Sequence, residues 1–233
     1  MAEDAKETLF ARTAAILGDE AVERLGAAHV LVVGVGGVGS WCAEALVRTG
    51  VGAVTVMDDD LVAASNVNRQ CPATSLTIGL PKTAAMKERL LAVNPGCRVE
   101  ARQERFESFD GLGGFDLVVD AIDSVGCKAE LILGATGRGI PVVSSMGAAM
   151  RTDPTKVVAR RFDKVEGDGL ARALRRRFRT LGRFPASPFV CVCSTEPPVK
   201  SADPTAKGSL MSVTATFGMC LAAEAVKILA TDR

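Results

Sequence analysis

The chain has 233 residues, 48% of them apolar, and a formal net charge of +1. This length and composition predict a soluble chain that buries a sizeable core, arranged as one domain or as one and a half. His29 is the single histidine, which excludes HExxH zinc sites and sites with several histidine ligands. It also excludes any Ser-His-Asp triad that would need a histidine at another position. The chemistry must therefore use Asp, Asn, Arg, Lys, Cys and backbone amides.

Neither the start of the chain nor its apolar runs indicate export or membrane insertion. Residues 1–6 are polar, and the most apolar stretch, residues 213–230, is interrupted by Glu224 and Lys227. We therefore expect a cytoplasmic protein with no membrane partner. The seven cysteines are scattered, include no CxxC pair and are expected to serve mostly as small buried apolar residues.

Short β-branched runs alternate with helical stretches from His29 onward. Five strands are predicted, over residues 30–33, 54–57, 98–101, 117–122 and 141–145. Helices are predicted before and between them, over residues 14–25, 40–49, 83–93 and 128–136. This alternation predicts an α/β fold, with a Rossmann-like, mostly parallel sheet flanked by helices.

The charge pattern changes after residue 150. Residues 151–183 contain eleven Lys or Arg against four acidic residues, so that segment carries +7 and the rest of the chain −6. We therefore divide the chain into a nucleotide-binding domain, residues 1–150, and a C-terminal extension, residues 151–233. Residues 184–209 are rich in Pro, Ser and Thr and are predicted to form a loop before a closing helix over residues 213–230.

The extension contains a predicted basic helix. Its apolar residues recur every three or four positions, at Leu170, Leu174, Phe178 and Leu181. The arginines outside this stripe form either a surface for nucleic acid phosphates or a merely solvated helix face. They are Arg172, Arg175, Arg176 and Arg179.

A glycine-rich loop follows the first predicted strand and opens a helix, the context in which a dinucleotide fingerprint is informative. Its glycines are Gly34, Gly36, Gly37 and Gly39. They allow a tight turn close to a phosphate, which the helix N-terminus attracts. Asp58 lies 24 residues after Gly34, at the end of the next strand, where a carboxylate accepts ribose hydroxyls. The loop predicts an adenine nucleotide site. The alternative is that its glycines only allow the helix to pack closely on the strand.

Further polar residues are predicted at the same edge of the sheet. Asp60, Asn66 and Arg69 lie in one loop, Lys82 begins a helix, and Asp123 follows the fourth strand. Ligands of open α/β sheets bind at the carboxyl ends of the strands. Two fixed cations suit a triphosphate better than the pyrophosphate of NAD, and Asp123 could hold Mg²⁺ through water. Taken singly, Lys82 and Arg69 could equally be solvated surface charges.

Together these motifs resemble the ThiF/MoeB/ubiquitin-activating-enzyme superfamily of ATP-dependent adenylating enzymes. The matching segments are GVGGVGS (34–40), the Asp58/Asp60 pair, NVNRQ (66–70), GLPK (79–82), VNPG (93–96) and DAIDS (120–124). The resemblance covers residues 10–150 and marks them as an ATP-binding adenylation domain.

The resemblance also implies roles for individual residues. The glycine loop and Asp58 would hold ATP, and the residues matching Asn66, Arg69 and Lys82 would contact its phosphates. Arg69 is of the kind that the second subunit of a homodimer can supply. Asp123 would be tied to Mg²⁺ and catalysis. Arg12 would reach the γ-phosphate, although Leu9 stands where the family has the first arginine of that pair.

Within this superfamily, the chain resembles the tRNA threonylcarbamoyladenosine dehydratase branch nearly end to end. The resemblance rests on SNVNRQ, DAIDSVGCKAELI and the late VCVCSTE and GSLMSVTATFG. It implies ATP-dependent activation of the threonyl carboxylate of threonylcarbamoyladenosine, next to the tRNA anticodon, and its closure into a cyclic base. The arginine helix would then meet tRNA, and a sulfur-transfer protein is a possible partner. Cys191 precedes the STE motif, where it either forms a transient thioester or has no specific role.

Two other functions compete with this one. An enzyme that adenylates the C-terminus of a ubiquitin-like sulfur carrier would usually hold zinc through two late CxxC pairs. No CxxC pair exists in this chain, so no zinc is expected. The basic segment would also have no role in such an enzyme, because the tail of a carrier protein docks at the nucleotide site without phosphate contacts. A nucleotide-binding or NAD-linked protein without adenylation activity would not need the NVNRQ, GLPK and DAIDS motifs together.

Overall fold

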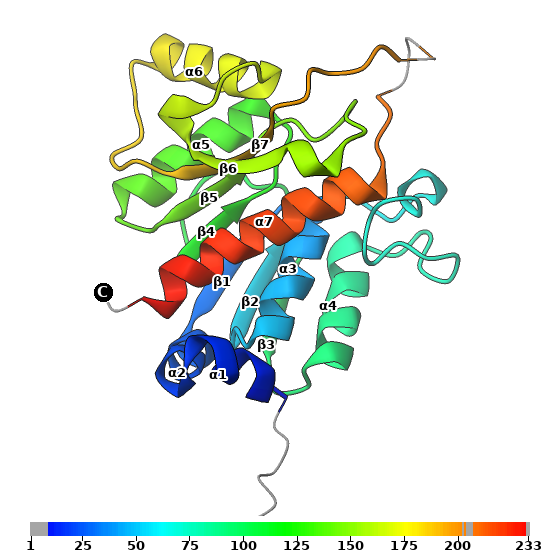
Figure 1. Cartoon of the computed structure of the whole chain (residues 1–233), viewed down its shortest axis with the longest axis vertical. Helices are drawn as coiled ribbons and strands as arrows, with labels where there is room; N and C mark the ends of the chain where they lie inside the picture. Colours follow the sequence, from blue (N-terminus) through cyan, green and yellow to red (C-terminus); the bar gives the residue numbers. More distant parts are fainter. Residues whose placement is uncertain (1–8, 202, 204–206, 232–233) are drawn as a thin grey trace, which may run out of the picture.

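The computed structural model describes residues 9–201, 203 and 207–231, so the polar segment 1–6 lies outside it. Seven strands form one sheet in the order β3-β2-β1-β4-β5-β7-β6 (Figure 1). They are β1 (His29–Val33), β2 (Ala53–Met57), β3 (Arg98–Arg102), β4 (Leu117–Asp120), β5 (Val142–Ser145), β6 (Val157–Arg161) and β7 (Val190–Ser194). Only the β6/β7 pair is antiparallel, which confirms the predicted Rossmann-like, mostly parallel sheet.

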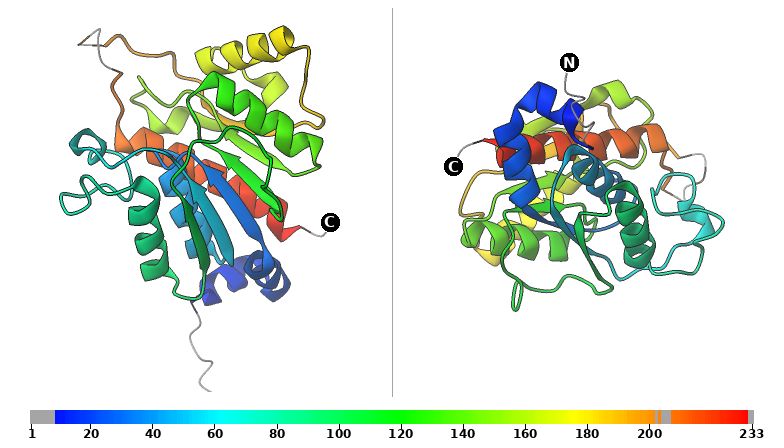
Figure 2. Two further views of the ribbon diagram at one scale, coloured as in Figure 1. Left: turned by 180° about the vertical axis from the view of Figure 1, so that it is seen from behind. Right: turned by 90° about the horizontal axis from the view of Figure 1, so that it is seen from below.

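Helices cover both faces of the sheet (Figures 1 and 2). One face carries α3 (Gly39–Thr49), α4 (Lys82–Val93) and α7 (Met211–Ala230). The other carries α5 (Val125–Gly137) and the basic helix α6 (Gly169–Leu181). Two short helices, α1 (Ala11–Leu17) and α2 (Asp19–Ala27), lie at the amino end of the strands. Short 3₁₀ turns cover Ala64–Asn66, Pro154–Lys156 and Phe162–Lys164.

The core has two layers because successive side chains of a strand point to opposite faces. On β1, Val30 and Val32 belong to the cluster that packs under α3 and α7. Leu31 and Val33 belong to the cluster under α5 and α6. A parallel sheet covered on both faces needs nearly continuous apolar strands, which β1, β2 and β4 supply, whereas the edge strand β3 alternates between polar and apolar residues.

The predicted elements fail in three places, one of which is β6, since the sequence predicts no strand over residues 157–161. The predicted helix over residues 14–25 is two helices, because Gly18 has a φ of 85° and separates α1 from α2. The prediction that residues 184–209 form only a loop is wrong, since β7 lies within that range and inserts between β5 and β6. The run VCVCS is short and flanked by Pro and Ser, so its β-branched residues gave little periodic signal.

Helix α7 is long and apolar enough to cross a bilayer by length and composition, with a mean hydropathy of 1.5. In the structure it lies against α3 and crosses the sheet from the carboxyl end of the strands towards α2 (Figure 1). Phe217, Leu221 and Ala225 are fully buried there. At its end, the Arg24 Nε donates to the Ala230 carbonyl over 2.9 Å. Helix α7 therefore serves as a core helix of this fold.

Candidate active site

A cavity of about 1190 Å³ opens at the carboxyl end of the parallel strands. Its walls come from the loops after β1, β2, β4 and β5 and from the first residues of α4 and α6. Nine of the predicted site residues line it together: Gly34, Gly36, Gly37, Asp58, Asp60, Asn66, Arg69, Lys82 and Asp123. The cavity therefore brings together most of the residues that the motifs predict for a nucleotide site.

The glycines of the loop meet three different requirements. Gly34 has a φ of +91°, and a Cβ there would lie 2.6 Å from the Ala121 carbonyl oxygen. A Cβ on Gly39 would lie 1.9 Å from the Gly34 carbonyl oxygen, so Gly39 permits close packing behind the cavity without lining it. A Cβ on Gly36 would meet nothing within 4 Å, because this residue faces the open cavity. Gly36 is therefore where the backbone can approach a phosphate.

Asp58 holds the glycine loop against the end of β2. Its carboxylate accepts hydrogen bonds from the backbone N–H of Val35 at 2.6 Å and of Asp60 at 2.9 Å. Each carboxylate oxygen keeps a further lone pair for a ligand such as a ribose hydroxyl. Asp58 thus shapes the phosphate loop in addition to its predicted ribose contact.

Lys82 is a buried cation at the edge of the cavity, with 5% of its surface exposed. Its Nζ lies 2.6 Å from the Asp60 carboxylate and 3.7 Å from that of Asp58. Its backbone N–H also donates to the Asp60 carbonyl. The amino group is held in one place by these contacts, as a charge that stabilises a transition state must be.

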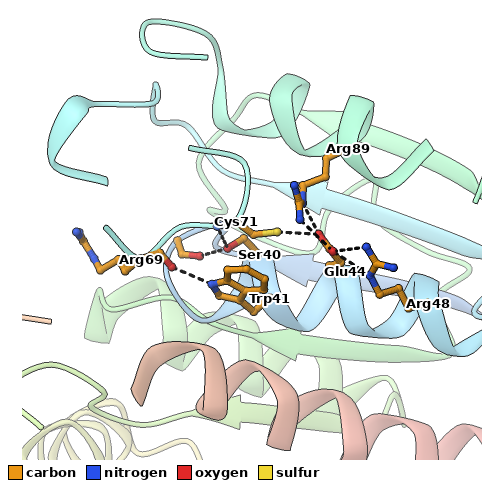
Figure 3. A network of polar contacts seen from close by, with 8 residues as sticks. Ser40, Trp41, Glu44, Arg48, Arg69, Cys71 and Arg89 are labelled. Carbon is orange, nitrogen blue, oxygen red and sulfur yellow. Dashed lines mark hydrogen bonds and ion pairs between the residues drawn. The ribbon is translucent and has the colours of Figure 1, made fainter. Parts of the chain in front are cut away.

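The segment that carries Asn66 and Arg69 is tied to the first turns of α3 (Figure 3). The Trp41 indole N–H donates to the Arg69 carbonyl over 2.9 Å. The Ser40 hydroxyl donates to the Gly36 carbonyl over 2.6 Å and accepts from the Cys71 backbone N–H over 3.1 Å. The Ser40 side chain thus connects the glycine loop to the residue that follows the NVNRQ motif.

Arg69 itself reaches along the cavity wall. Its Nη1 donates to the Ser65 carbonyl at 2.7 Å and to the Asn68 side chain at 2.9 Å. Asn66 is buried, and its side-chain oxygen accepts from the Ala63 N–H. These bonds fix the loop locally and leave the remaining donors of Arg69 at the exposed wall of the cavity.

Glu44 is a buried carboxylate that the sequence analysis did not identify. It accepts from Cys71 Sγ at 2.8 Å and pairs with Arg48 at 2.8 Å and with Arg89 (Figure 3). Burial alone would raise the pKa of Glu44, but the hydrogen bonds from Arg89, Cys71 and Arg48 lower it below its ordinary value. Glu44 therefore joins α3, α4 and the segment after Arg69 behind the cavity. A glutamate between apolar helix positions gave no sequence signal of this role.

A second buried pair lies beneath the DAIDS motif. Lys128 Nζ lies 2.8 Å from the Asp120 carboxylate, and both side chains are fully buried. The Ser144 hydroxyl donates to the same carboxylate, and Lys128 Nζ donates to the Ile122 carbonyl. These bonds hold the loop between β4 and α5 in place, which leaves Asp123 exposed at the cavity.

Besides Gly39, two predicted ATP-site or catalytic residues do not reach the cavity. Arg12 is exposed on α1, at the opposite end of the sheet, so the prediction that it contacts ATP is not met within one chain (Figure 1). Cys191 is fully buried in β7 beside Ser144. Burial raises the pKa of its thiol well above the ordinary value. The structure therefore favours the alternative in which Cys191 has no nucleophilic role, because β7 places it inside the sheet and away from the cavity.

The predicted tRNA-binding arginines lie outside the cavity and divide into two groups. Arg172, Arg176 and Arg179 are exposed on α6. Arg175 is half-buried, and its Nη2 donates to the carbonyls of Phe162 and Val165 at 2.7 and 2.5 Å. Its guanidinium also lies 5.0 Å from the centre of the Phe162 ring. Arg175 therefore anchors α6 to the preceding turn.

Comparison with known proteins places this site in a family. The model of the ThiF family matches residues 10–233. The tRNA threonylcarbamoyladenosine dehydratase of Escherichia coli (strain K12) is 42% identical over 182 residues, which cover 76% of this chain and 68% of that protein. The dehydratase of Bacillus subtilis (strain 168) is 42% identical over 178 residues, with coverages of 74% and 70%.

Similarity extends to solved structures. The crystal structure of the E. coli tRNA N6-threonylcarbamoyladenosine dehydratase in complex with ATP matches with a TM-score of 0.87 and 38% identity. The match covers 98% of this chain and 96% of that one. With the glycine loop, Lys82, Arg69 and Asp123 around one cavity, the sequence, fold and site agree, and the chain belongs to the ThiF family.

Proposed function

We propose that this protein is an ATP-dependent tRNA threonylcarbamoyladenosine dehydratase. The observation that carries the proposal is likeness along the whole chain to a dehydratase solved with ATP. The cavity supports it, because the residues that would meet ATP lie together at the carboxyl end of the sheet. A cytoplasmic location would suit a tRNA substrate.

The reaction requires activation because a carboxylate has no good leaving group. A carboxylate oxygen of the threonyl group attacks the α-phosphorus of ATP, and the bond to pyrophosphate breaks. A nucleophile of the same modified nucleoside then attacks the acyl carbon, loses its proton and displaces AMP. One carboxylate oxygen leaves with AMP, so the nucleoside loses one water. Ring closure inside one molecule benefits from a high effective concentration and needs no nucleophile from the protein.

The protein would position the substrates and neutralise the negative charge of the ATP phosphates. Lys82 and Arg69 would neutralise the phosphates while the backbone at Gly36 approaches them. Because Cys191 is buried with a raised thiol pKa, no thioester is included in this scheme. The chain therefore relies on fixed cations and ATP chemistry, in keeping with its single histidine.

Mg²⁺ would add further positive charge, and the carboxylates at the cavity suit it. Mg²⁺ prefers carboxylate oxygens and water. Asp123 is exposed at the cavity and has no ion pair within the described residues. Asp58, Asp59 and Asp60 also bring oxygens within 4.8 Å of one another, but Lys82 already lies beside two of them. Asp123 is therefore the residue that we assign to the ion, which would neutralise charge on the phosphates.

The resemblance also implies a homodimer, which we retain as a proposal. Leu76, Ile78 and Leu80 expose 91%, 48% and 43% of their surfaces on the segment that joins Arg69 to Lys82. Exposed apolar side chains of this kind suit contact with another protein surface. A sulfur-transfer partner remains a prediction from the resemblance alone.

The function is tested by following the modified nucleoside. Purified protein, ATP and Mg²⁺ should convert threonylcarbamoyladenosine-containing tRNA to the cyclic nucleoside, with one AMP and one pyrophosphate per product. Mass spectrometry of digested tRNA measures the nucleoside, and Asp123→Asn serves as a low-activity control. Absence of the cyclic product would contradict the proposal. Pyrophosphate exchange that requires a sulfur-carrier tail instead of this tRNA would favour the competing adenylyltransferase.

The exposed arginines of α6 are proposed to contact tRNA phosphates. The double variant Arg172→Gln/Arg176→Gln should weaken tRNA binding. The slope of the logarithm of the association constant against the logarithm of the salt concentration should become less negative by about 1 for each lost phosphate contact. The slope is obtained from tRNA affinities measured at salt concentrations between about 50 and 200 mM. Arg175→Gln is the matched comparison, since its loss should lower thermal stability while leaving the slope as in wild type. An unchanged slope in the double variant would place tRNA elsewhere.

A further inference from the structure

Arg151 is a buried cation in the wall of the cavity that the sequence motifs did not include. Only 4% of its surface is exposed. Its Nε and Nη1 atoms are buried and have no hydrogen-bond partner in the described part of the chain. No ion pair to a described carboxylate accompanies them. The residue lines the same cavity as Lys82 and Asp123.

The backbone on both sides of Arg151 is fixed. The N–H of Met150 donates to the Gly208 carbonyl at 2.9 Å, and the Val199 N–H donates to the Met150 carbonyl at 2.8 Å. Met150 has a φ of 60°, which is uncommon for a residue with a side chain. On the other side, the Glu196 carboxylate accepts from the N–H groups of Thr152 and Asp153. The backbone around Arg151 is thus held by Glu196 of the STE motif and by Val199 and Gly208 further along the chain.

An unpaired buried guanidinium is unfavourable in the free protein. A charge taken out of water needs a partner of opposite charge or hydrogen-bond acceptors to offset the lost hydration. Lys128 and Lys82, the other buried cations at this end of the sheet, both have such carboxylate partners. Arg151 differs from them, which indicates that its partner arrives with a ligand.

The position of Arg151 separates it from the nucleotide-binding residues. Asp58 and the glycine loop follow β2 and β1, whereas Arg151 follows β5, on the other side of β4. The phosphates already have Lys82, Arg69 and the backbone at Gly36. The second anion of the reaction is the carboxylate, which must approach the α-phosphate although both are negatively charged. A cation on the β5 side would offset that repulsion and orient the attacking oxygen.

We propose that Arg151 binds the carboxylate of the group to be adenylated and so distinguishes the modified tRNA from unmodified tRNA. This assignment rests on the proposed dehydratase function. It makes Arg151 a substrate-binding residue whose guanidinium donates to the carboxylate oxygens. The contact is made before adenylation and lost when the carboxylate becomes an acyl phosphate ester.

The test removes either the Arg151 guanidinium from the protein or the carboxylate from the RNA. Two anticodon stem-loop RNAs, with and without threonylcarbamoyladenosine, are bound to wild type and to Arg151→Gln in the presence of α,β-methylene ATP, which prevents adenylation. Wild type should prefer the modified RNA by about tenfold, the usual worth of a charge-assisted hydrogen bond. Arg151→Gln should lose that preference and retain wild-type affinity for the unmodified RNA and for the ATP analogue. Arg138→Gln, an exposed arginine after α5, should behave as wild type.

Other results would overturn the assignment. If Arg151→Gln keeps the preference, the carboxylate binds elsewhere, and if the ATP analogue loses affinity, Arg151 serves the phosphates. Equal weakening of both RNAs would make it a backbone contact. Should Arg151→Gln fail to fold, Arg151→Lys must retain part of the preference. Arg151→Met should melt at or above the wild-type temperature, and a lower value would contradict an unpaired charge. Wild type without any preference would instead refute the dehydratase function.

Discussion

Replacing Lys82 with methionine is expected to lower kcat/KM for the dehydration by about 10³-fold, the loss found when one preorganised charge donor is removed. The amino group is buried and fixed between Asp58 and Asp60 at the cavity. The variant would lack this cation and would also leave the two carboxylates unpaired beside the phosphates of ATP. Rates of cyclic nucleoside formation at saturating ATP measure the effect.

The matched control for this prediction lies on the same helix. Lys87 is exposed on α4, so Lys87→Met removes an equal charge from the protein without reaching the cavity. Its activity should equal that of wild type. A Lys82 variant that retains more than a tenth of wild-type activity would show that other groups neutralise the phosphates.

Replacing Gly39 with alanine is expected to lower the free energy of unfolding by about 3 kcal/mol, at the upper end of overpacking costs. The new Cβ would lie 1.9 Å from the Gly34 carbonyl oxygen, so the glycine loop and α3 must move apart. Both sides of this contact are backbone, which leaves no rotamer to relieve the clash. Urea denaturation followed by circular dichroism measures the change.

Gly36→Ala separates stability from binding. A Cβ at Gly36 enters open cavity space, so the free energy of unfolding should stay within about 0.5–1 kcal/mol of wild type. The methyl group would nevertheless occupy the approach to the phosphate, and ATP binding should weaken at least about tenfold. Wild-type ATP affinity in Gly36→Ala would mean that the phosphates do not meet this part of the loop.

The strands and the nucleotide residues could be predicted because their signals are local. Val30 to Val33 are continuously apolar and are followed by glycines with a required geometry, and such a pattern has few other uses. Asp58 directly follows β2 and Asp123 comes shortly after β4, so the sheet topology alone brings them to the same edge, whereas Lys82 begins α4. These predictions needed no knowledge of contacts between distant segments.

The roles of Cys191, Arg175 and Arg151 depend on contacts from elsewhere in the chain. The sequence around Cys191 predicts a loop, but pairing with β5 and with the antiparallel β6 makes its segment a buried strand. The sequence does not distinguish Arg175 from Arg172, Arg176 and Arg179, but among these four Arg175 is the one that donates to the carbonyls of Phe162 and Val165. Arg151 carried no motif, and its unusual feature is the absence of a partner among the described residues. Composition and spacing contain no information about such partners.

Trp41 gives the cavity an optical reporter. It is the only tryptophan, and the chain has no tyrosine, so its indole accounts for essentially all fluorescence excited at long ultraviolet wavelengths. Its ring N–H donates to the carbonyl of Arg69, whose side chain lines the cavity (Figure 3). A movement of the NVNRQ segment would change this hydrogen bond and with it the emission. The protein therefore carries a natural fluorescent label at the point where the NVNRQ segment contacts α3.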